Sequence, residues 1–180
     1  DRLVPTAVDV SGLVSFDGFI DVTAGGNHTC GLSSDSKVFC WGENANGQLG
    51  DNSTATSSVP VQVNVASVTT LSGFSEVKAG STHTCGRMTD GLVYCWGSFS
   101  NGKLGGTYVA DQLVPVHVKI GSNGLKNIVS LEVGRHHSCA ITAEGKAMCW
   151  GQQGAEGRLG NNSAVSSADP VAVDVTALLG

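Results

Sequence analysis

Residues 83–97 read HTCGRMTDGLVYCWG, and this stretch decides the fold. Two short segments, 83–88 and 92–97, flank the triplet Thr89-Asp90-Gly91. An Asp-Gly step between two such segments is typical of a tight β-hairpin turn, because Gly readily adopts the positive φ that the turn requires. The stretch therefore predicts two antiparallel strands joined by a short turn.

The same pattern occurs twice more, as HTCGLSSDSKVFCWGENANGQLG from His28 and as HSCAITAEGKAMCWGQQGAEGRLG from His137. The four prolines obey one rule, since each lies 55 residues after the previous one: Pro5, Pro60, Pro115 and Pro170. Self-similarity at a fixed period is the sequence signature of a repeat architecture. The chain is therefore built from tandem copies of one unit of about 55 residues.

Two further strands are expected in each unit. The stretch VPVQVNV (59–65) alternates apolar and polar residues, which indicates a half-buried strand, and SEVKAG (75–80) forms a second short one. Four antiparallel strands per unit at this period predict an all-β fold made of three propeller-type blades. We divide the chain into repeats 1–58, 59–113 and 114–168, with 169–180 as the start of a fourth repeat or as a strand that pairs with another subunit.

Residues 28–50, 83–105 and 137–160 resemble the repeat of the regulator of chromosome condensation family. The resemblance rests on the His-Thr or His-Ser pair, the Cys-Trp-Gly step and the closing NANGQLG, SNGKLG and GAEGRLG. It implies a β-propeller, commonly of seven blades. Function varies widely within this family, so it has to be argued from the sites.

Two cysteines recur in every copy, at positions that are usually not Cys in the family. Cys85 and Cys95 lie five positions on either side of Asp90, so they face each other across the predicted hairpin. We predict three disulfides within blades: Cys30–Cys40, Cys85–Cys95 and Cys139–Cys149. Metal binding by His-x-Cys-x9-Cys and free buried thiols are the alternatives, but structural zinc sites use four ligands and closer Cys spacing. Disulfides imply an oxidising compartment, so we expect a secreted or cell-surface protein.

A histidine and a tryptophan also recur at matched positions. We expect structural roles for His28, His83 and His137, because a catalytic histidine is needed once and not in every blade. We expect the rings of Trp41, Trp96 and Trp150 to pack between blades, with a carbohydrate-stacking ladder as the alternative. The additional His136 leaves a pH-sensitive or metal site open.

Three triplets fit the N-glycosylation pattern, at Asn27, Asn52 and Asn161. Asn52 and Asn161 follow Leu-Gly in loops rich in Ser, Thr and Ala, so both should be exposed. Asn52 is the best candidate, and Asn27 is the weakest because it adjoins the blade core.

The composition narrows the function classes. The chain has 180 residues and a net charge of −5, so it carries no electrostatic footprint for nucleic acid or an anionic membrane. No apolar run is long enough to span a membrane as a helix. The carboxylates Glu43, Asp51, Asp90, Glu144 and Glu156 do not recur as a pair, and no phosphate loop or nucleophile elbow is present. We therefore expect no catalytic residue, no metal and no cofactor.

Three blades cannot close a propeller, which needs at least four. There are also four Pro-containing strands, at 4–10, 59–65, 114–120 and 169–175, but three Cys hairpins. Either the chain is part of a longer propeller, or its open edges pair with other copies, as a six-bladed ring of two chains or head to tail as a filament. The surplus strand favours the head-to-tail contact.

Our leading hypothesis is a non-enzymatic, extracellular structural or binding protein that assembles with itself or with further blades, as a surface fibre or adhesin. The alternative is a secreted propeller that binds or inhibits a protein or glycan partner through loops 43–58, 98–112 and 152–168, with Phe99 and Tyr108 as the contacts. Nucleotide exchange on a small GTPase, which the family resemblance implies, is disfavoured by the cysteines and the acidic balance. Lyase or glycosidase activity has no residue to support it.

Overall fold

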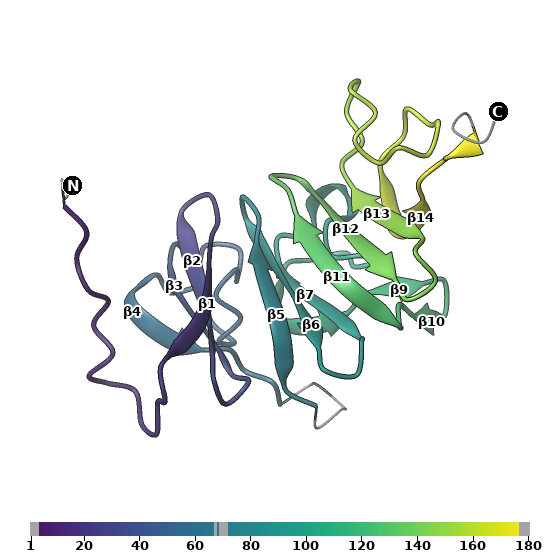
Figure 1. Cartoon of the computed structure of the whole chain (residues 1–180). Coiled ribbons are helices and arrows are strands. Elements are labelled where there is room, and N and C mark those ends of the chain that lie inside the picture. The colour runs from purple at the N-terminus through teal and green to yellow at the C-terminus, as the bar shows by residue number, and fades with distance from the viewer. Residues whose placement is uncertain (1–3, 67, 69–71, 177–180) are drawn as a thin grey trace.

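The computed structural model of the chain describes residues 4–66, 68 and 72–176. Three four-stranded antiparallel sheets stand side by side as blades and leave the ring open at both ends (Figure 1). The strands are β1 (Phe19–Ala24), β2 (His28–Ser33), β3 (Val38–Gly42) and β4 (Ser57–Gln62) in blade 1; β5 (Phe74–Ala79), β6 (His83–Met88), β7 (Val93–Gly97) and β8 (Gln112–His117) in blade 2; β11 (Ile128–Val133), β12 (His137–Thr142), β13 (Ala147–Gly151) and β14 (Ser167–Ala172) in blade 3. A short 3-10 helix, η1 (Ser100–Gly102), and a two-stranded ribbon, β9 (Lys119–Ile120) with β10 (Asn123–Gly124), lie outside the blades.

The central hairpin of each blade has the register that the sequence predicts. Cys85 lies opposite Cys95 in the pairing of β6 with β7, and their Cα atoms are 4.0 Å apart. The structure contains the three disulfides expected from the spacing: Cys30–Cys40, Cys85–Cys95 and Cys139–Cys149. Gly91 takes φ +80° in the hairpin turn of blade 2, whereas blade 1 places Ser36 at φ 64° in the matching turn. A side chain in this left-handed region costs about 1 kcal/mol relative to Gly, so the turn of blade 1 is the least favourable of the three.

The fourth strand of each blade is a Pro-containing stretch that comes from the next sequence repeat. In β14, Val171 pairs with Cys149 of β13, so this strand closes blade 3. The blades therefore do not coincide with the division at residues 58, 113 and 168, and residues 167–172 do not begin a fourth blade. The surplus Pro-containing stretch lies at the other end, since residues 4–10 form no strand and are almost entirely exposed. Pro has no N–H group to donate, so a sheet accommodates it on an edge strand, and each fourth strand is the edge of its sheet.

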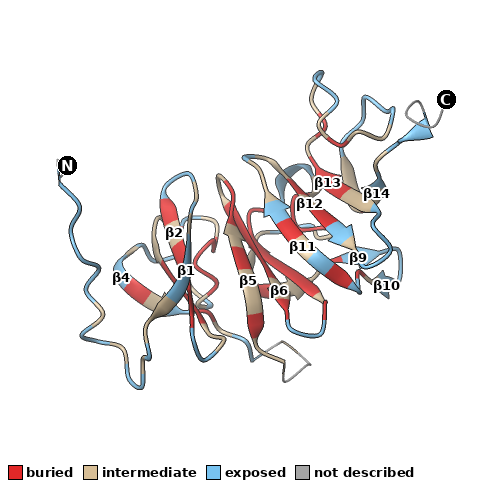
Figure 2. Ribbon diagram, in the orientation of Figure 1, coloured by how far each residue is buried: buried red, intermediate tan, exposed pale blue. Residues whose placement is uncertain are grey.

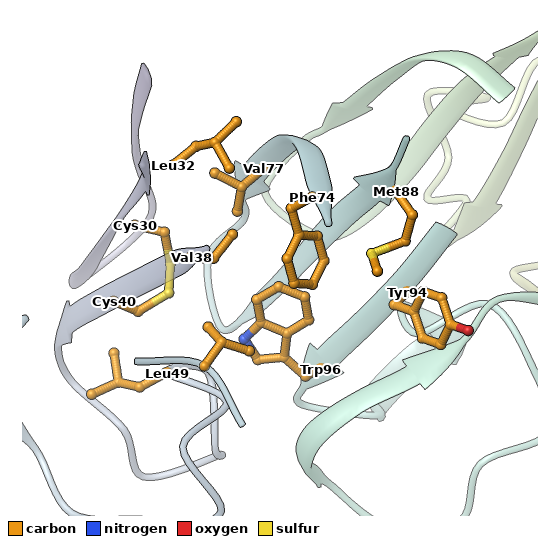
Figure 3. Close-up of a cluster of buried hydrophobic side chains, with 11 residues drawn as sticks. Cys30, Leu32, Val38, Cys40, Leu49, Phe74, Val77, Met88, Tyr94 and Trp96 are labelled. Carbon is orange, nitrogen blue, oxygen red and sulfur yellow. A yellow bond between two sulfur atoms is a disulfide. The ribbon is translucent and has the colours of Figure 1, made fainter. Parts of the chain in front are cut away.

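The hydrophobic core lies between the sheets. Blade 1 contributes the Cys30–Cys40 disulfide, Leu32, Val38 and Leu49 to a cluster whose other half comes from blade 2 (Figure 3). A second cluster of the same kind joins blades 2 and 3, where Leu104 and Val118 pack with Leu131 and Trp150. Both faces of the middle blade are therefore covered, and Figure 2 shows its strands as the most continuously buried part of the molecule.

We predict that replacing both cysteines of the middle blade, Cys85→Ser with Cys95→Ser, lowers the free energy of unfolding by about 2–3 kcal/mol, the chain-entropy value for so short a loop. Urea denaturation of the oxidised wild type and of the double variant measures the difference. Alkylation without reduction, followed by mass spectrometry, is the control and should label no cysteine in the wild type. Labelled thiols, or equal stability of the two proteins, would contradict the disulfide account.

Candidate functional site

The most specific polar contacts in the molecule join neighbouring blades. His28 of β2 lies with its Nε2 atom 2.8 Å from the Thr84 hydroxyl of β6. Thr84 donates to the main-chain carbonyl of Gln48 at 2.8 Å, and the Trp96 indole donates to the same oxygen at 3.0 Å. We call this set of contacts the junction. It ties one loop carbonyl of blade 1 to two buried donors of blade 2.

Proton accounting fixes the state of His28. The single hydroxyl proton of Thr84 is directed at Gln48, so Thr84 must accept a proton from Nε2 of His28. His28 is therefore the neutral tautomer with the proton on Nε2. Burial agrees with this assignment, because it lowers the pKa of His28 to about 4, although the nearby Glu43 carboxylate raises it in part.

The histidine–hydroxyl and tryptophan–carbonyl contacts of the junction recur between blades 2 and 3. His83 Nε2 lies 3.1 Å from the Ser138 hydroxyl, and the Trp150 indole donates to the Lys103 carbonyl at 3.0 Å. His83 is fully buried, and burial, followed by the positive charge of Lys103, lowers its pKa to about 3. The histidine, the hydroxyl and the tryptophan that recur in the sequence thus form one structural unit across each blade boundary.

A glycine three residues before each histidine makes room for its ring. A Cβ atom built on Gly25 would lie 2.5 Å from the His28 ring, and one on Gly80 would lie 2.4 Å from the His83 ring. Real side-chain atoms do not approach so closely, so a larger residue would push the imidazole away from its hydroxyl partner. The Ala-Gly and Val-Gly endings of the first strand in each blade therefore serve the junction.

A buried amide side chain holds the loop that presents the acceptor carbonyl. The Asn44 carbonyl accepts from the Leu49 amide at 2.9 Å, and its NH2 group donates to Ser53 and Ala55 carbonyls farther along the loop. Gln153 holds Leu159 in the same way in blade 3. Neither Asn44 nor Gln153 was predicted from the sequence, although each stands three positions after the tryptophan. Blade 2 has Phe99 at that position, so the signal is present in two copies of three.

Blades 1 and 3 each carry half of a junction on their outer faces. Thr29 and Trp41 of blade 1 correspond to Thr84 and Trp96, and His137 of blade 3 corresponds to His28 and His83. No blade lies on these outer sides among the residues that the structure describes. Phe16 partly covers the outer face of blade 1, with its ring 4.6 Å from that of Phe19 and 5.6 Å from that of Phe39. We call these surfaces the N-terminal face of blade 1 and the C-terminal face of blade 3.

Apolar side chains are exposed on both faces. Val22 is 62% exposed, whereas Val77 and Leu131 at the matching positions are 0% exposed. On the C-terminal face, Ile141 is 38% exposed, and the matching Leu32 is 3% exposed at the first junction. The faces therefore have the composition of a junction from which one blade is absent.

The other residues singled out from the sequence do not converge on a reaction centre. The C-terminal ends of β1, β5 and β11, with the residues that follow them, line an open cleft of about 490 Å³. Its lining is mainly small residues and backbone, and Arg135 is its one charged side chain within the described chain. The carboxylates lie apart in different loops: Asp51 accepts from Asn44, Asp90 from Ser72, and Glu156 from Arg158.

His136 lies beside Arg135, His137 and Arg158 around a second opening. Burial, followed by the positive charges of Lys103, Arg135 and Arg158, lowers the pKa of His136. The described residues hold no group of three or more His, Cys, Asp or Glu side chains that could hold a metal ion. Nor do they include a helix long and apolar enough to cross a membrane.

The two residues expected to contact a partner differ. Phe99 is 37% exposed at the edge of the loop after β7. Tyr108, in contrast, is half-buried and donates its hydroxyl proton to the His117 carbonyl at 2.6 Å. Tyr108 therefore fastens its loop to β8, and Phe99 remains as the aromatic side chain of that loop available for contact.

The three glycosylation triplets also differ in their exposure. Asn52 is exposed at a left-handed turn position with φ 65°. The Asn161 side chain accepts from Gln153 at 3.2 Å, and the Asn27 amide donates to Glu43 at 3.0 Å. Asn27 is exposed as well, whereas Asn161 is half-buried.

The comparison with family models matches the description "Regulator of chromosome condensation (RCC1) repeat". One model matches residues 19–48, 74–103 and 128–157, and a second matches 35–86 and 90–141. The segments of the first set begin with the first strand of each blade, and the first two end at Gln48 and Lys103, whose carbonyls accept the tryptophan hydrogen bonds.

Curated relatives are much longer than this chain. The "Probable E3 ubiquitin-protein ligase HERC4" of Homo sapiens is 33% identical over 153 residues, which are 84% of this chain and 14% of that protein. "Protein pim1" of Schizosaccharomyces pombe is 29% identical over 147 residues, which are 73% of this chain and 27% of that protein.

Solved structures share the fold. Human WBSCR16 superposes with a TM-score of 0.77 at 23% identity, over 92% of this chain and 40% of that one. Yeast RCC1 (Prp20), in a crystal structure with Kap60 bound to it, superposes with a TM-score of 0.73 at 22% identity, over 88% of this chain and 37% of that one. These proteins support the propeller fold.

We predict that Thr84→Val lowers the free energy of unfolding by about 1–3 kcal/mol, because it leaves the buried Nε2–H of His28 without an acceptor and removes one of the two donors to the Gln48 carbonyl. Thr29→Val is the matched control, since the same change on the N-terminal face removes no junction contact. It should alter stability by less than about 0.5 kcal/mol. Urea denaturation of both variants checks the difference, and equal losses would contradict a specific role for the junction.

Proposed function

Because the chain belongs to the regulator of chromosome condensation (RCC1) repeat family, we propose that it is a non-enzymatic structural and binding module that assembles through the open faces of its blades. One observation carries the proposal. A histidine–hydroxyl contact and a tryptophan–carbonyl contact occur at both blade boundaries, and at the opposite ends of the described chain the two halves of this junction face no further blade.

The chemistry of the two faces favours their association. The N-terminal face offers the Thr29 hydroxyl and the Trp41 indole, and the C-terminal face offers the His137 imidazole and the carbonyl of Arg158, which corresponds to that of Gln48. Joining the faces would bury Val22 and Ile141, as Val77 and Leu32 are buried already. Removing apolar surface from water contributes about 25 cal/mol per Å², and the internal junctions already have this composition.

Self-association through unlike faces has a geometric consequence. Each chain supplies both halves of the junction, so a second copy can dock head to tail, and its own far face stays free for a third. A contact of this kind adds subunits until the rotation closes a ring, or continues as a filament. Further blades of the same repeat in a longer chain would satisfy the faces by the same contacts.

The non-enzymatic role rests on the character of the clefts. The cleft between the inner strand ends presents backbone and small side chains with one charged group, which is poor material for acid–base or nucleophilic chemistry. Yeast RCC1 (Prp20) is described with Kap60 bound to it, and this supports a protein-binding role for the fold.

We further infer that the protein works in an oxidising compartment, secreted or at a cell surface. The motivation is that all three blades carry a disulfide and that the described residues include no free cysteine. Cytosolic thiols are kept reduced, so three matched disulfides favour an oxidising compartment.

We predict that the purified chain forms concentration-dependent oligomers and that Val22→Asp prevents them, because the change places a carboxylate where internal junctions are fully buried. Val109→Asp is the matched control, since Val109 is 87% exposed in the outer loop of the middle blade and should not affect assembly. Light scattering coupled to size-exclusion chromatography measures the mass. A wild type that stays monomeric up to millimolar concentration would refute the self-assembly.

A further inference from the structure

At the boundary between blades 1 and 2, the loop that follows β3 contacts the end of β7. A Cβ atom built on Gly97 of blade 2 would lie 3.3 Å from the Cα atom of Gln48 in blade 1. Ser98, which follows Gly97, therefore adjoins Gln48 across the boundary. Lys103 and Gln152 hold the corresponding places between blades 2 and 3.

The two internal junctions hold no pair of opposite charges at these places. Gln48 and Ser98 are both neutral, and of the corresponding residues Lys103 is a cation and Gln152 is neutral. Lys103 is 4% exposed, its amino group donates to the Thr82 hydroxyl at 2.9 Å, and burial lowers its pKa. No carboxylate of the described chain forms an ion pair with it within 4.0 Å.

The open faces hold the opposite-charge combination. Arg158 occupies the loop position on the C-terminal face, and Glu43 occupies the turn position on the N-terminal face. The same spacing that sets Gln48 beside Ser98 would set Arg158 beside Glu43 of a docked copy. An Arg–carboxylate pair supplies directed, charge-assisted hydrogen bonds.

We propose that the C-terminal face receives the N-terminal face of a second copy of this chain, and that Arg158 selects that partner by pairing with Glu43 of the second copy. This proposal rests on the assembly proposed above. It adds the partner, which is a second copy of the chain, the head-to-tail direction of the contact and the two residues that determine both.

The present partners of the two side chains leave them available. Arg158 lies 2.9 Å from Glu156, whose side chain is 67% exposed, and Glu43 accepts a hydrogen bond from the exposed Asn27 amide. An exposed ion pair contributes little to stability, so little free energy is lost when Arg158 exchanges Glu156 for a carboxylate shielded within an interface. The exchange also brings a carboxylate to the C-terminal face, where Arg135, His136 and His137 lie around Arg158. The added negative charge lowers the repulsion between the arginines there.

Charge also decides the direction of assembly. Two N-terminal faces brought together would oppose Glu43 to Glu43, and two C-terminal faces would oppose Arg158 to Arg158. Juxtaposed like charges strongly disfavour an interface, so the head-to-tail arrangement is favoured over both symmetric ones. The net charge of −5 opposes unspecific association of copies, so the local pair supplies the specificity.

Charge reversal tests the proposal by sedimentation velocity at low salt. Each single variant, R158E or E43R, should weaken assembly at least about tenfold, because it places like charges together. An equimolar mixture of the two variants should assemble like the wild type. In that mixture, the C-terminal face of each variant meets an opposite charge on the N-terminal face of the other.

K126E is the matched control, since Lys126 is exposed in the segment between blades 2 and 3 and the change alters the net charge as R158E does. It should leave assembly unchanged. If the wild type assembles but the single variants assemble equally well, or their mixture is not restored, the charge-selected contact is overturned and the proposed function stands. If the wild type does not assemble at all, both are overturned.

Discussion

The arrangement of the blades depends on one buried carbonyl oxygen at each boundary. The Gln48 carbonyl accepts from the Thr84 hydroxyl and from the Trp96 indole, so the loop of one blade satisfies two donors of the next. A buried donor without an acceptor costs about 1–3 kcal/mol, so neither sheet can slide or rotate without losing several contacts together. The imidazole of His28 completes the set because Thr84 must itself accept a proton. The hydrophobic contact between sheets supplies stabilisation, and these polar contacts fix its geometry.

The disulfides act within blades and the junctions act between them. Each disulfide joins the two central strands of a small sheet that has few apolar neighbours of its own. The middle blade shows how much burial a neighbouring blade adds. Val77 is fully buried, whereas Val22 at the same position of blade 1 is exposed. A blade is therefore held together by its own covalent bond, but it obtains a complete core only from its neighbours.

Local spacing was enough to predict much of this structure. The positions of Cys85 and Cys95 about Asp90 give the hairpin register, and repetition of His83 and Trp96 gives their structural role. The blade boundaries did not follow, because a Pro-containing strand has the same pattern whether it opens one sheet or closes another. The sequence period reveals how long a unit is and leaves open where it begins.

Contacts made through the backbone could not be predicted from the sequence either. The acceptor at each junction is a main-chain carbonyl, so the identities of Gln48 and Lys103 carry no signal for it. The buried amides of Asn44 and Gln153 escaped because blade 2 breaks their repetition with Phe99. Tyr108 looked like a contact residue because an aromatic in a polar loop is usually exposed, whereas its hydroxyl bonds to the chain of β8.

The protonation of the junction histidines tests the central claim most directly. A nitrogen-detected NMR titration of the oxidised chain reports the tautomer and the pKa of each imidazole. The account predicts that His28 carries its proton on Nε2 at neutral pH, and that His28 and His83 remain neutral until the pH falls to about 4 and about 3. Titration of either ring near its ordinary pKa of about 6.5, or a proton on Nδ1 of His28, would contradict the junction as described.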